Sequence, residues 1–269
     1  MNDREPHTRA YWDLRAAAHL GTAREACAVC EATQLVRGAV APLEERGARS
    51  VAANLPPGRT LEVGCGYGRW FDLVGPGRRL IGMDFSMVMG HAAQQRGLAP
   101  VLLGDARRLP VAAGALDGAY TMKVLQFLPD PDRAAAVAGI FRAVRPGGRV
   151  VLYEKIARPG GCPPDRWIDW GERAGGRLLR WDGNQFSPLD RLLAGMVRAL
   201  RPAAPHGATT AAAALGPPLR DRHPGWYRLY HRAHRLAMRL SLPFEPLLER
   251  VLPDGWAEHA IFVFEKPAR

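Results

Sequence analysis

The segment Thr60–Trp70 constrains this chain most, because an apolar run there enters a loop with glycine at every second position. The three glycines are Gly64, Gly66 and Gly68. Such a loop lets the backbone approach a ligand more closely than a β-carbon would permit. It also leads into a helix, whose N-terminus favours an anionic group. The sequence therefore predicts a strand, a tight ligand-binding turn and a helix.

The glycine spacing argues against two common nucleotide sites. A dinucleotide fingerprint needs its third glycine one position later, where this chain has Arg69. A P-loop needs Gly-Lys-Ser/Thr at its end, and no such sequence closes the loop. The loop alone is a weak signal, so its meaning depends on the residues further along the chain.

Short apolar runs alternate with helical segments over the next hundred residues. The runs predicted as strands are Thr60–Val63, Arg79–Asp84, Pro100–Gly104, Leu116–Met122 and Arg149–Glu154. Helices are predicted near Gly68–Val74, Ser86–Arg96 and Pro131–Val144. This alternation predicts parallel strands joined by right-handed crossovers, a Rossmann-like, doubly wound sheet of the α/β class.

Acidic residues stand at or near the ends of three predicted strands. They are Glu62, Asp84 and Asp105. Open α/β sheets bind ligands at the carboxyl ends of their strands, so these side chains and the glycine loop are expected to share one crevice. Each acid taken singly also fits a solvated strand end or a helix cap. Their joint placement favours a binding site.

Five motifs together resemble the class I S-adenosylmethionine-dependent methyltransferases, particularly the branch that acts on small molecules. The motifs are Glu62–Gly68, Gly82–Ser86, Gly104–Ala106 with Leu109-Pro110, Leu116–Asp130 and Arg145–Gly148. The resemblance covers residues 55–155 and implies a seven-stranded sheet whose last strand is antiparallel, which His259–Glu265 fits. One departure is Gln126, which stands where many relatives have histidine.

The resemblance implies S-adenosylmethionine as cofactor and S-adenosylhomocysteine as product. It implies that Glu62 and the glycines hold the methionine part, that Asp84 binds the ribose, and that the following residues meet the adenine. The predicted cofactor-binding residues are Glu62, Gly64, Cys65, Gly66, Gly68, Asp84, Phe85, Ser86, Asp105, Ala106, Lys123 and Tyr11. Tyr11 fits ordinary packing equally well. No metal-binding residue is predicted.

Methyl transfer from a sulfonium requires mainly alignment and exclusion of water, so no fixed catalytic constellation is expected. Two candidates are Glu154, which closes the fifth strand, and His223, which precedes a predicted amphipathic helix. Glu154 also fits a strand-end ion pair, and His223 fits a solvated residue.

Changes in composition and in the pattern of apolar residues along the chain suggest three parts. Residues 1–54 are expected to form an N-terminal helical cap, residues 55–182 and 256–269 the cofactor-binding core, and residues 183–255 a helical acceptor-binding lid. A Pro/Ala/Thr-rich stretch, Arg201–Pro218, is interpreted as a loop within the lid. Five of the 7 Trp residues come after residue 155, which suits a planar or apolar acceptor as well as a subdomain core.

The net charge of +11 would ordinarily suggest a polyanionic partner. The excess is spread over both halves, however, and only 3 of the 37 basic residues are lysine, which is typical of a GC-rich coding sequence. No nucleic-acid-binding module is recognisable. One predicted helix carries Arg228, Arg232, Arg235 and Arg239 at helical spacing, facing solvent, an anionic acceptor or, as a less favoured alternative, a membrane.

Other features bound the class of protein. The chain has no apolar run long enough to span a membrane and no signal-like N-terminus, so a cytoplasmic location is expected. Cys27 and Cys30 are read as two apolar helix residues rather than a metal or redox pair. The sequence thus predicts a monomeric or homodimeric methyltransferase acting on a small-molecule, specialised-metabolite acceptor, as in antibiotic biosynthesis. The alternatives are a cofactor-binding cyclase and a methyltransferase for a membrane lipid or quinone.

Overall fold

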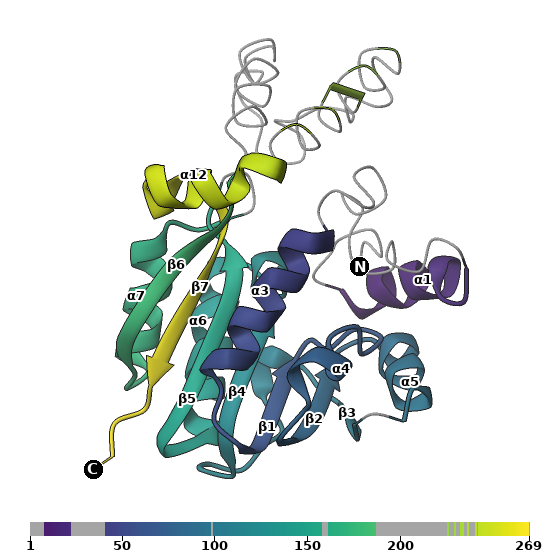
Figure 1. The fold of residues 1–269 in the computed structure, drawn as a ribbon. Helices are drawn as coiled ribbons and strands as arrows, with labels where there is room; N and C mark the ends of the chain where they lie inside the picture. The colour runs from purple at the N-terminus through teal and green to yellow at the C-terminus, as the bar shows by residue number, and fades with distance from the viewer. Residues whose placement is uncertain are drawn as a thin grey trace, which may run out of the picture.

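A seven-stranded sheet forms the centre of the protein in the computed structural model (Figure 1). The structure describes residues 8–22, 41–97, 99–157, 161–186 and 242–268, with residues 225, 229, 232, 233, 236 and 240. The strands are β1 (Gly58–Val63), β2 (Arg78–Asp84), β3 (Val101–Leu103), β4 (Leu116–Met122), β5 (Val144–Lys155), β6 (Arg177–Phe186) and β7 (Ala257–Glu265). Their order is β3-β2-β1-β4-β5-β7-β6.

Helices and short 3-10 turns connect the strands. The helices are α1 (Arg9–His19), α3 (Ala41–Asn54), α4 (Phe71–Val74), α5 (Met87–Gln95), α6 (Asp130–Ala143), α7 (Pro164–Arg173) and α12 (Glu245–Val251). The 3-10 turns are η2 (Ala106–Arg108), η3 (Leu125–Phe127), η4 (Leu242–Phe244) and η5 (Asp254–Trp256).

Strand directions confirm the predicted fold class. Strands β1 to β5 pair in parallel, and β7 lies antiparallel between β5 and β6. The strand order reverses between β1 and β4, so the crossovers on either side of this point leave a crevice at the carboxyl ends of the strands. The glycine loop lies at this position, directly after β1.

Helices cover both faces of the sheet, and each face has its own apolar core. On one face Ile140 and Phe141 of α6 and Trp167 of α7 pack with Phe262 and Phe264 of β7. On the other face the buried residues are Ala48, Val51, Leu55, Phe71, Val74, Tyr120, Val151, Tyr153, Ile261 and Val263. Burying such side chains contributes about 1.5–3 kcal/mol each. Trp167 and Trp170 therefore belong to the core rather than to an acceptor pocket.

Helix α3, part of the segment predicted as an N-terminal helical cap, packs against the sheet. Val51 and Ala48 are fully buried in the second core. The end of the helix is held by Arg78 of β2, whose guanidinium donates to the carbonyl oxygens of Ala52 at 2.5 Å and Leu55 at 2.8 Å. These bonds satisfy backbone acceptors that the helix itself leaves unpaired.

Two boundaries differ from the predicted ones for local reasons. The helix expected from Gly68 begins only at Phe71, because Gly68 has a φ of +75°, which a right-handed helix does not permit. The sequence also predicts a strand over Arg177–Trp181, and in the structure this strand continues to Phe186, where it pairs with Ala257 of β7. The sequence further predicts a helix that starts near Ser187 and reaches Leu200. This helix and the Arg201–Pro218 loop lie outside the described residues.

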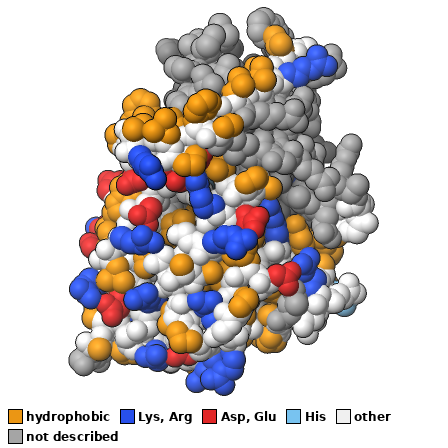
Figure 2. All heavy atoms as spheres, viewed as in Figure 1, with side chains coloured by type: hydrophobic (Ala, Val, Ile, Leu, Met, Phe, Trp, Pro, Cys, Tyr) orange, Lys and Arg blue, Asp and Glu red, His pale blue; other side chains and the backbone are white. Residues whose placement is uncertain are grey.

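The surface distribution of charge agrees with the spread seen in the sequence. Figure 2 shows basic and acidic side chains interspersed over the face that carries α3, with apolar side chains gathered on α12. Within the described parts of the chain, no helix is long and apolar enough to cross a membrane.

Candidate functional site

The glycine loop turns sharply at the carboxyl end of β1. Gly64, Gly66 and Gly68 have φ values of +76°, +55° and +75°, which side chains other than glycine rarely adopt. The amide of Gly64 donates to the Met83 carbonyl at 2.7 Å, which ties the loop to β2. A β-carbon on Gly64 would lie 2.5 Å from Cγ1 of Val124, so glycine is needed for space as well as for conformation.

A fourth glycine, in β2, completes this tight packing. A β-carbon on Gly82 would lie 2.6 Å from Cζ of Phe71 and 2.9 Å from Sγ of Cys65. Cys65, predicted to bind the cofactor, is 4% exposed and packs here with the second core. A glycine inside a strand often marks a close approach, so Gly82 was recognisable from the sequence.

Asp84 organises the loop from the end of β2. Its Oδ2 accepts a hydrogen bond from the Gly66 amide at 2.7 Å, and its Oδ1 accepts one from the Ser86 amide at 2.8 Å. Burial raises the pKa of the Asp84 carboxyl to about 6, although these backbone bonds oppose the rise. Asp84 therefore holds the glycine loop in shape while presenting a carboxylate beside it.

Glu62 lies under the loop and is 1% exposed. The hydroxyl of Tyr120 in β4 donates to Oε2 of Glu62 at 2.7 Å. Burial raises the pKa of Glu62 to about 8, and the charge of Asp84 adds to the rise. No ion pair to Glu62 or Asp84 is formed by any residue that the structure describes. The two carboxyl groups thus lie together beside the loop, and Glu62 keeps its proton up to about pH 8.

Asp105 follows β3 as predicted, but its carboxylate is already engaged. Arg107 binds it through Nε at 2.9 Å from both oxygens and through Nη2 at 2.6 Å from Oδ2. Burial alone would raise the pKa of Asp105, yet the bonds from Arg107 lower it. The Arg107 guanidinium also lies 5.5 Å from the Phe85 ring centroid. Arg107, which follows Ala106 in η2, therefore links Asp105 with Phe85. Arg107 was not among the residues predicted from the sequence.

Helix α1 covers one side of the crevice. Oδ1 of Asp13 accepts hydrogen bonds from the Ser86 hydroxyl at 2.5 Å and from the Val88 amide at 3.3 Å, at the start of α5. The Trp12 ring packs edge-on against Phe127, with ring centroids 4.9 Å apart. Tyr11, a predicted site residue, also belongs to α1, and its ring centroid lies 5.1 Å from that of Trp12.

A buried ion-pair cluster joins the loop to the end of β4. Lys123 has a φ of +61°, and its Nζ lies 3.0 Å from Oε1 of Glu44 in α3. Arg69, next to Gly68, lies 2.7 Å from Oε2 of the same carboxylate. Burial would raise the pKa of Glu44, but the two cations outweigh it and lower the pKa. Glu44 and Arg69 resemble ordinary helix and loop residues in the sequence and were missed.

Glu154 has contacts unlike those expected of a base at the mouth of the site. It is wholly buried, and its carboxylate accepts hydrogen bonds from the amides of Val124, Leu125 and Gln126 at 3.1–3.3 Å. Burial raises its pKa, and these bonds oppose the rise. Its position indicates that it holds the turn after β4. The other catalytic candidate, His223, lies outside the described residues, as do Cys27 and Cys30.

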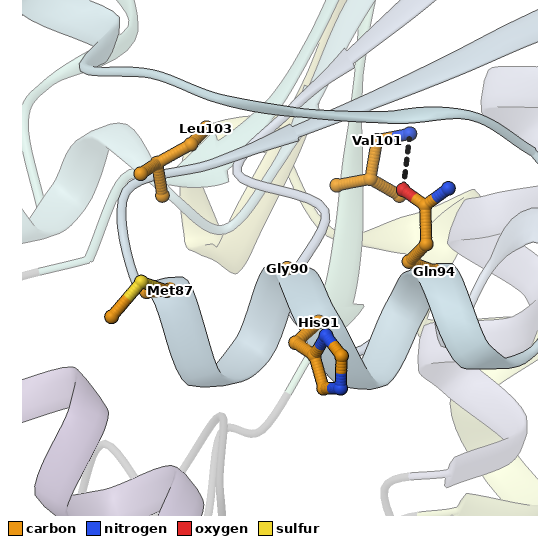
Figure 3. Close-up of a pocket in the computed structure, with 6 residues that line it drawn as sticks. All are labelled: Met87, Gly90, His91, Gln94, Val101 and Leu103. Atoms are coloured by element: carbon orange, nitrogen blue, oxygen red, sulfur yellow. Dashed lines mark hydrogen bonds between the residues drawn. The ribbon is translucent and has the colours of Figure 1, made fainter.

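A shallow groove lies between α5 and the edge strand β3. It has a volume of about 310 Å³ and is lined by Met87, Gly90, His91, Gln94, Val101 and Leu103 (Figure 3). The Gln94 side chain accepts a hydrogen bond from the Val101 amide at 3.3 Å, so it covers part of the strand edge. None of the predicted site residues lines this groove. No group of metal ligands is found among the residues that the structure describes.

Comparison with known proteins identifies the central part of the chain. Residues 61–152 match the model of a protein family described as a methyltransferase domain. This range contains the second half of β1, all of β2 to β4, most of β5 and the carboxylates of the crevice.

Two curated relatives show the range of activities among similar proteins. Malonyl-[acyl-carrier protein] O-methyltransferase of Serratia marcescens is 31% identical over 51% of this chain and 51% of its own length. A protein named as an S-adenosyl-L-methionine-dependent Diels-Alderase, from Talaromyces variabilis, is 35% identical over 39% of each chain. The chain spans from about a third to just over half of the length of the curated relatives that it matches.

The fold extends beyond this central part. A solved structure of geranyl diphosphate C-methyltransferase from Streptomyces coelicolor, in complex with S-adenosyl-L-homocysteine, superposes with a TM-score of 0.53. The match covers 86% of this chain and 83% of that one at 12% identity, so it establishes a shared fold.

Proposed function

Because the chain carries a methyltransferase domain of the class I, S-adenosylmethionine-dependent type, we propose that it transfers a methyl group from this cofactor to a small-molecule acceptor. The observation that carries the proposal is the glycine loop at the end of β1, held by the Asp84 carboxylate. Asp84 and Asp105 stand at successive strand ends beside it.

The crevice suits this cofactor in shape and charge. A β-carbon on Gly64 would overlap the Val124 side chain, so this glycine lets the loop pack tightly against the turn after β4. Glu62 and Asp84 lie nearby without a cationic partner among the residues described. A ligand with a sulfonium and an ammonium group supplies the missing positive charge. In this proposal the Asp84 carboxylate binds the ribose hydroxyls, and Phe85 with Asp105 meets the adenine.

When bound, the cofactor supplies an electrophilic methyl group, which a nucleophile attacks in line with the departing sulfur. The chain's own residues then have to orient the acceptor and exclude water. Glu154 fixes the turn after β4 through three backbone amides. Trp12 of α1 packs against Phe127 of that turn. We therefore assign Glu154 to positioning rather than to proton transfer.

The acceptor is proposed to be a small, specialised metabolite bound partly by residues 183–255. That segment connects β6 to β7, and its two ends meet where Phe186 pairs with Ala257. A role in antibiotic biosynthesis, a monomeric or homodimeric state and a cytoplasmic location remain parts of this proposal.

Calorimetry with S-adenosylmethionine and S-adenosylhomocysteine tests the cofactor site. Asp84→Asn removes a charge and directs an amide N–H₂ at a backbone N–H, so cofactor affinity should fall about ten- to a hundredfold. Asp72→Asn is the matched control, because the Asp72 side chain is 64% exposed on α4 and should leave affinity unchanged. Absence of binding to the unaltered protein would refute the proposal.

A second candidate keeps the cofactor but not methyl transfer. The 35% identical Diels-Alderase favours a cyclisation in which the bound cofactor is a structural element. Incubating the protein with methyl-labelled cofactor and a host-cell metabolite extract separates the two functions. Transfer of label supports the methyltransferase, whereas cofactor binding without transfer supports the cyclase. Label that partitions into extracted lipid or quinone would identify the remaining alternative acceptor.

A further inference from the structure

A buried polar cluster lies beside the cofactor crevice, on the side of the sheet that faces α3. We call it the α3-side cluster and define it by its residues, Glu44, Arg69, Lys123, Tyr153, Asn184 and His259. Glu44 bridges Arg69 and Lys123. The Tyr153 hydroxyl donates to Oδ1 of Asn184 at 2.7 Å, and the Lys123 ammonium lies 5.4 Å from the Tyr153 ring centroid.

The cluster spans the carboxyl ends of the strands next to the glycine loop. Lys123 follows β4, and Tyr153 is near the end of β5. His259 of β7 pairs in register with both Lys155 and Asn184. Arg69 carries the cluster back to Gly68, so it is continuous with the proposed cofactor site. An acceptor that reaches the cofactor over β4 and β5 would meet this cluster.

Backbone strain is concentrated at the same place. In the described parts of the chain, Lys123 and Gln185 are the residues other than glycine with positive φ, at +61° and +67°. Lys123 directly follows β4, and Gln185 follows Asn184 in β6. Strain of this kind persists where the surrounding structure enforces it, often at binding sites.

Two buried polar atoms of this region have no hydrogen-bond partner among the residues described. They are Nδ1 of His259 and Oε1 of Gln185. His259 is 8% exposed, and its ring lies edge-on to Tyr153 with centroids 5.8 Å apart. Buried polar atoms are nearly always paired, so an orphaned imidazole nitrogen beside a strained lysine points to a ligand that completes the site.

The charges of the cluster do not cancel. Arg69 and Lys123 are opposed by the single carboxylate of Glu44. Burial lowers the pKa of His259 well below its usual range, and Lys123 and Lys155 lower it further, so the imidazole stays neutral.

The surrounding ionisable groups are largely paired with one another. Lys155 lies 2.9 Å from Glu258, and Arg46 lies 2.6 Å from Glu249 and 3.5 Å from Glu245. Tyr153 stays neutral, because burial raises its pKa. Arg46 thus faces two carboxylates, and burial raises the pKa of one of them, Glu245, to about 7. Within the α3-side cluster itself, two cations face the one carboxylate of Glu44.

We propose that the α3-side cluster binds an anionic oxygen of the acceptor, such as a phenolate, enolate or carboxylate, with Lys123 as its cation and His259 as a neutral polar contact. This inference rests on the proposed function. The acceptor enters with its oxygen deprotonated, so the chain needs no base. The oxygen lone pair forms the O–CH₃ bond, the S–CH₃ bond breaks with its electrons going to sulfur, and the two charges neutralise.

The probe for this subsite is 4-nitrophenol, whose anion absorbs visible light. The probe is mixed with protein that is saturated with S-adenosylhomocysteine, the pH is raised with alkali, and the absorbance of the anion gives the pH at which the bound probe ionises. A cation in the subsite should lower the ionisation midpoint of the bound probe by about 1–3 pH units. Benzoate serves as the carboxylate arm and should compete with the probe. The neutral ether 4-nitroanisole should bind more weakly than 4-nitrophenol.

Lys123→Met removes a cation and Glu44→Gln removes an anion, so the two variants together separate anion binding from a structural role. Lys123→Met should return the probe's midpoint toward its value in free solution, and Lys123→Arg should keep it low. Glu44→Gln removes the opposing carboxylate, so it should lower the midpoint further and tighten benzoate binding. A general loss of folding would shift the probe's midpoint in the same direction in Lys123→Met and in Glu44→Gln. Arg173→Met removes a surface cation of α7 that is 77% exposed, and should behave as the unaltered protein does.

Three results would overturn the inference. These are a bound probe that ionises as in free solution, a midpoint that shifts in the same direction in Lys123→Met and Glu44→Gln, and 4-nitroanisole binding as tightly as 4-nitrophenol. Binding of S-adenosylhomocysteine is measured first. If it binds and the probe result fails, the oxyanion subsite is wrong while the proposed function stands. If it does not bind, both are refuted.

Discussion

Replacing Glu62 by glutamine tests the electrostatic argument for the crevice directly. Glu62 is 1% exposed, and it accepts a hydrogen bond from the Tyr120 hydroxyl at 2.7 Å. Burial raises its pKa from 4.5 to about 8. Glutamine has the shape of the protonated acid and can still accept the Tyr120 bond, but it never becomes charged.

The sign of the effect depends on the proton balance. Between about pH 4.5 and about pH 8 the folded protein holds a proton on Glu62 that the unfolded chain has released. The free energy of unfolding therefore falls as the pH rises through this range. At about 1.4 kcal/mol per pH unit the fall reaches roughly 5 kcal/mol as an upper limit. Glu62→Gln lacks this contribution, so the variant should gain stability over the unaltered protein as the pH rises.

Urea unfolding without cofactor, at about pH 5 and about pH 9, measures the difference. We expect the advantage of Glu62→Gln to grow by several kcal/mol between the two conditions. Glu45→Gln is the control, because Glu45 is a half-exposed partner of Arg49 and should show no such growth. Calorimetry should show weaker S-adenosylmethionine binding by Glu62→Gln. Parallel stability profiles for the unaltered protein and the variant would refute the reasoning.

Three further substitutions test packing around the site. Gly64→Ala should abolish measurable S-adenosylhomocysteine binding in calorimetry. Adding Val124→Ala should recover part of the binding, because it removes the clash, while φ strain of about 1–2 kcal/mol at residue 64 persists. If the double variant recovers no binding, the contact with Val124 is not the cause of the loss. Gly47→Ala sets a β-carbon 2.5 Å from Cε1 of Tyr153, and should lower unfolding free energy in urea by about 1–3 kcal/mol. Glu154→Gln directs an amide group at a backbone N–H and should cost about 1–3 kcal/mol in the same assay, and an unchanged midpoint would count against its positioning role.

The fold was predictable because its signals are local. The apolar runs and the glycines after β1 determine strand, turn and helix within a few residues. The three predicted carboxylates do lie at successive strand ends, because parallel strands bring their carboxyl ends to one edge. The late helix start at Phe71 was missed because the sequence does not reveal that Gly68 has positive φ.

The partners of the site residues were not predictable, since they come from distant parts of the chain. Asp13 reaches Ser86, Glu44 reaches Lys123, and Tyr120 reaches Glu62. Each is an ordinary polar residue in its local sequence.

The role of Glu154 could not be predicted, because it depends on which face of the sheet the side chain lies on. Neighbouring residues of a strand face opposite sides of the sheet. Tyr153 faces α3, whereas Glu154 contacts the turn after β4. The sequence established its position at the strand end but not its contacts.

The pairing of Phe186 with Ala257 means that the long connection between β6 and β7 leaves and re-enters the sheet on adjacent strands. Its ends are held together by the sheet, whatever its length. Loop-closure entropy changes by only about 0.6 kcal/mol when such a connection doubles in length. Evolution can therefore exchange this segment for one of different length and sequence at little cost to the core, so that new acceptors become accessible while the cofactor site is inherited unchanged.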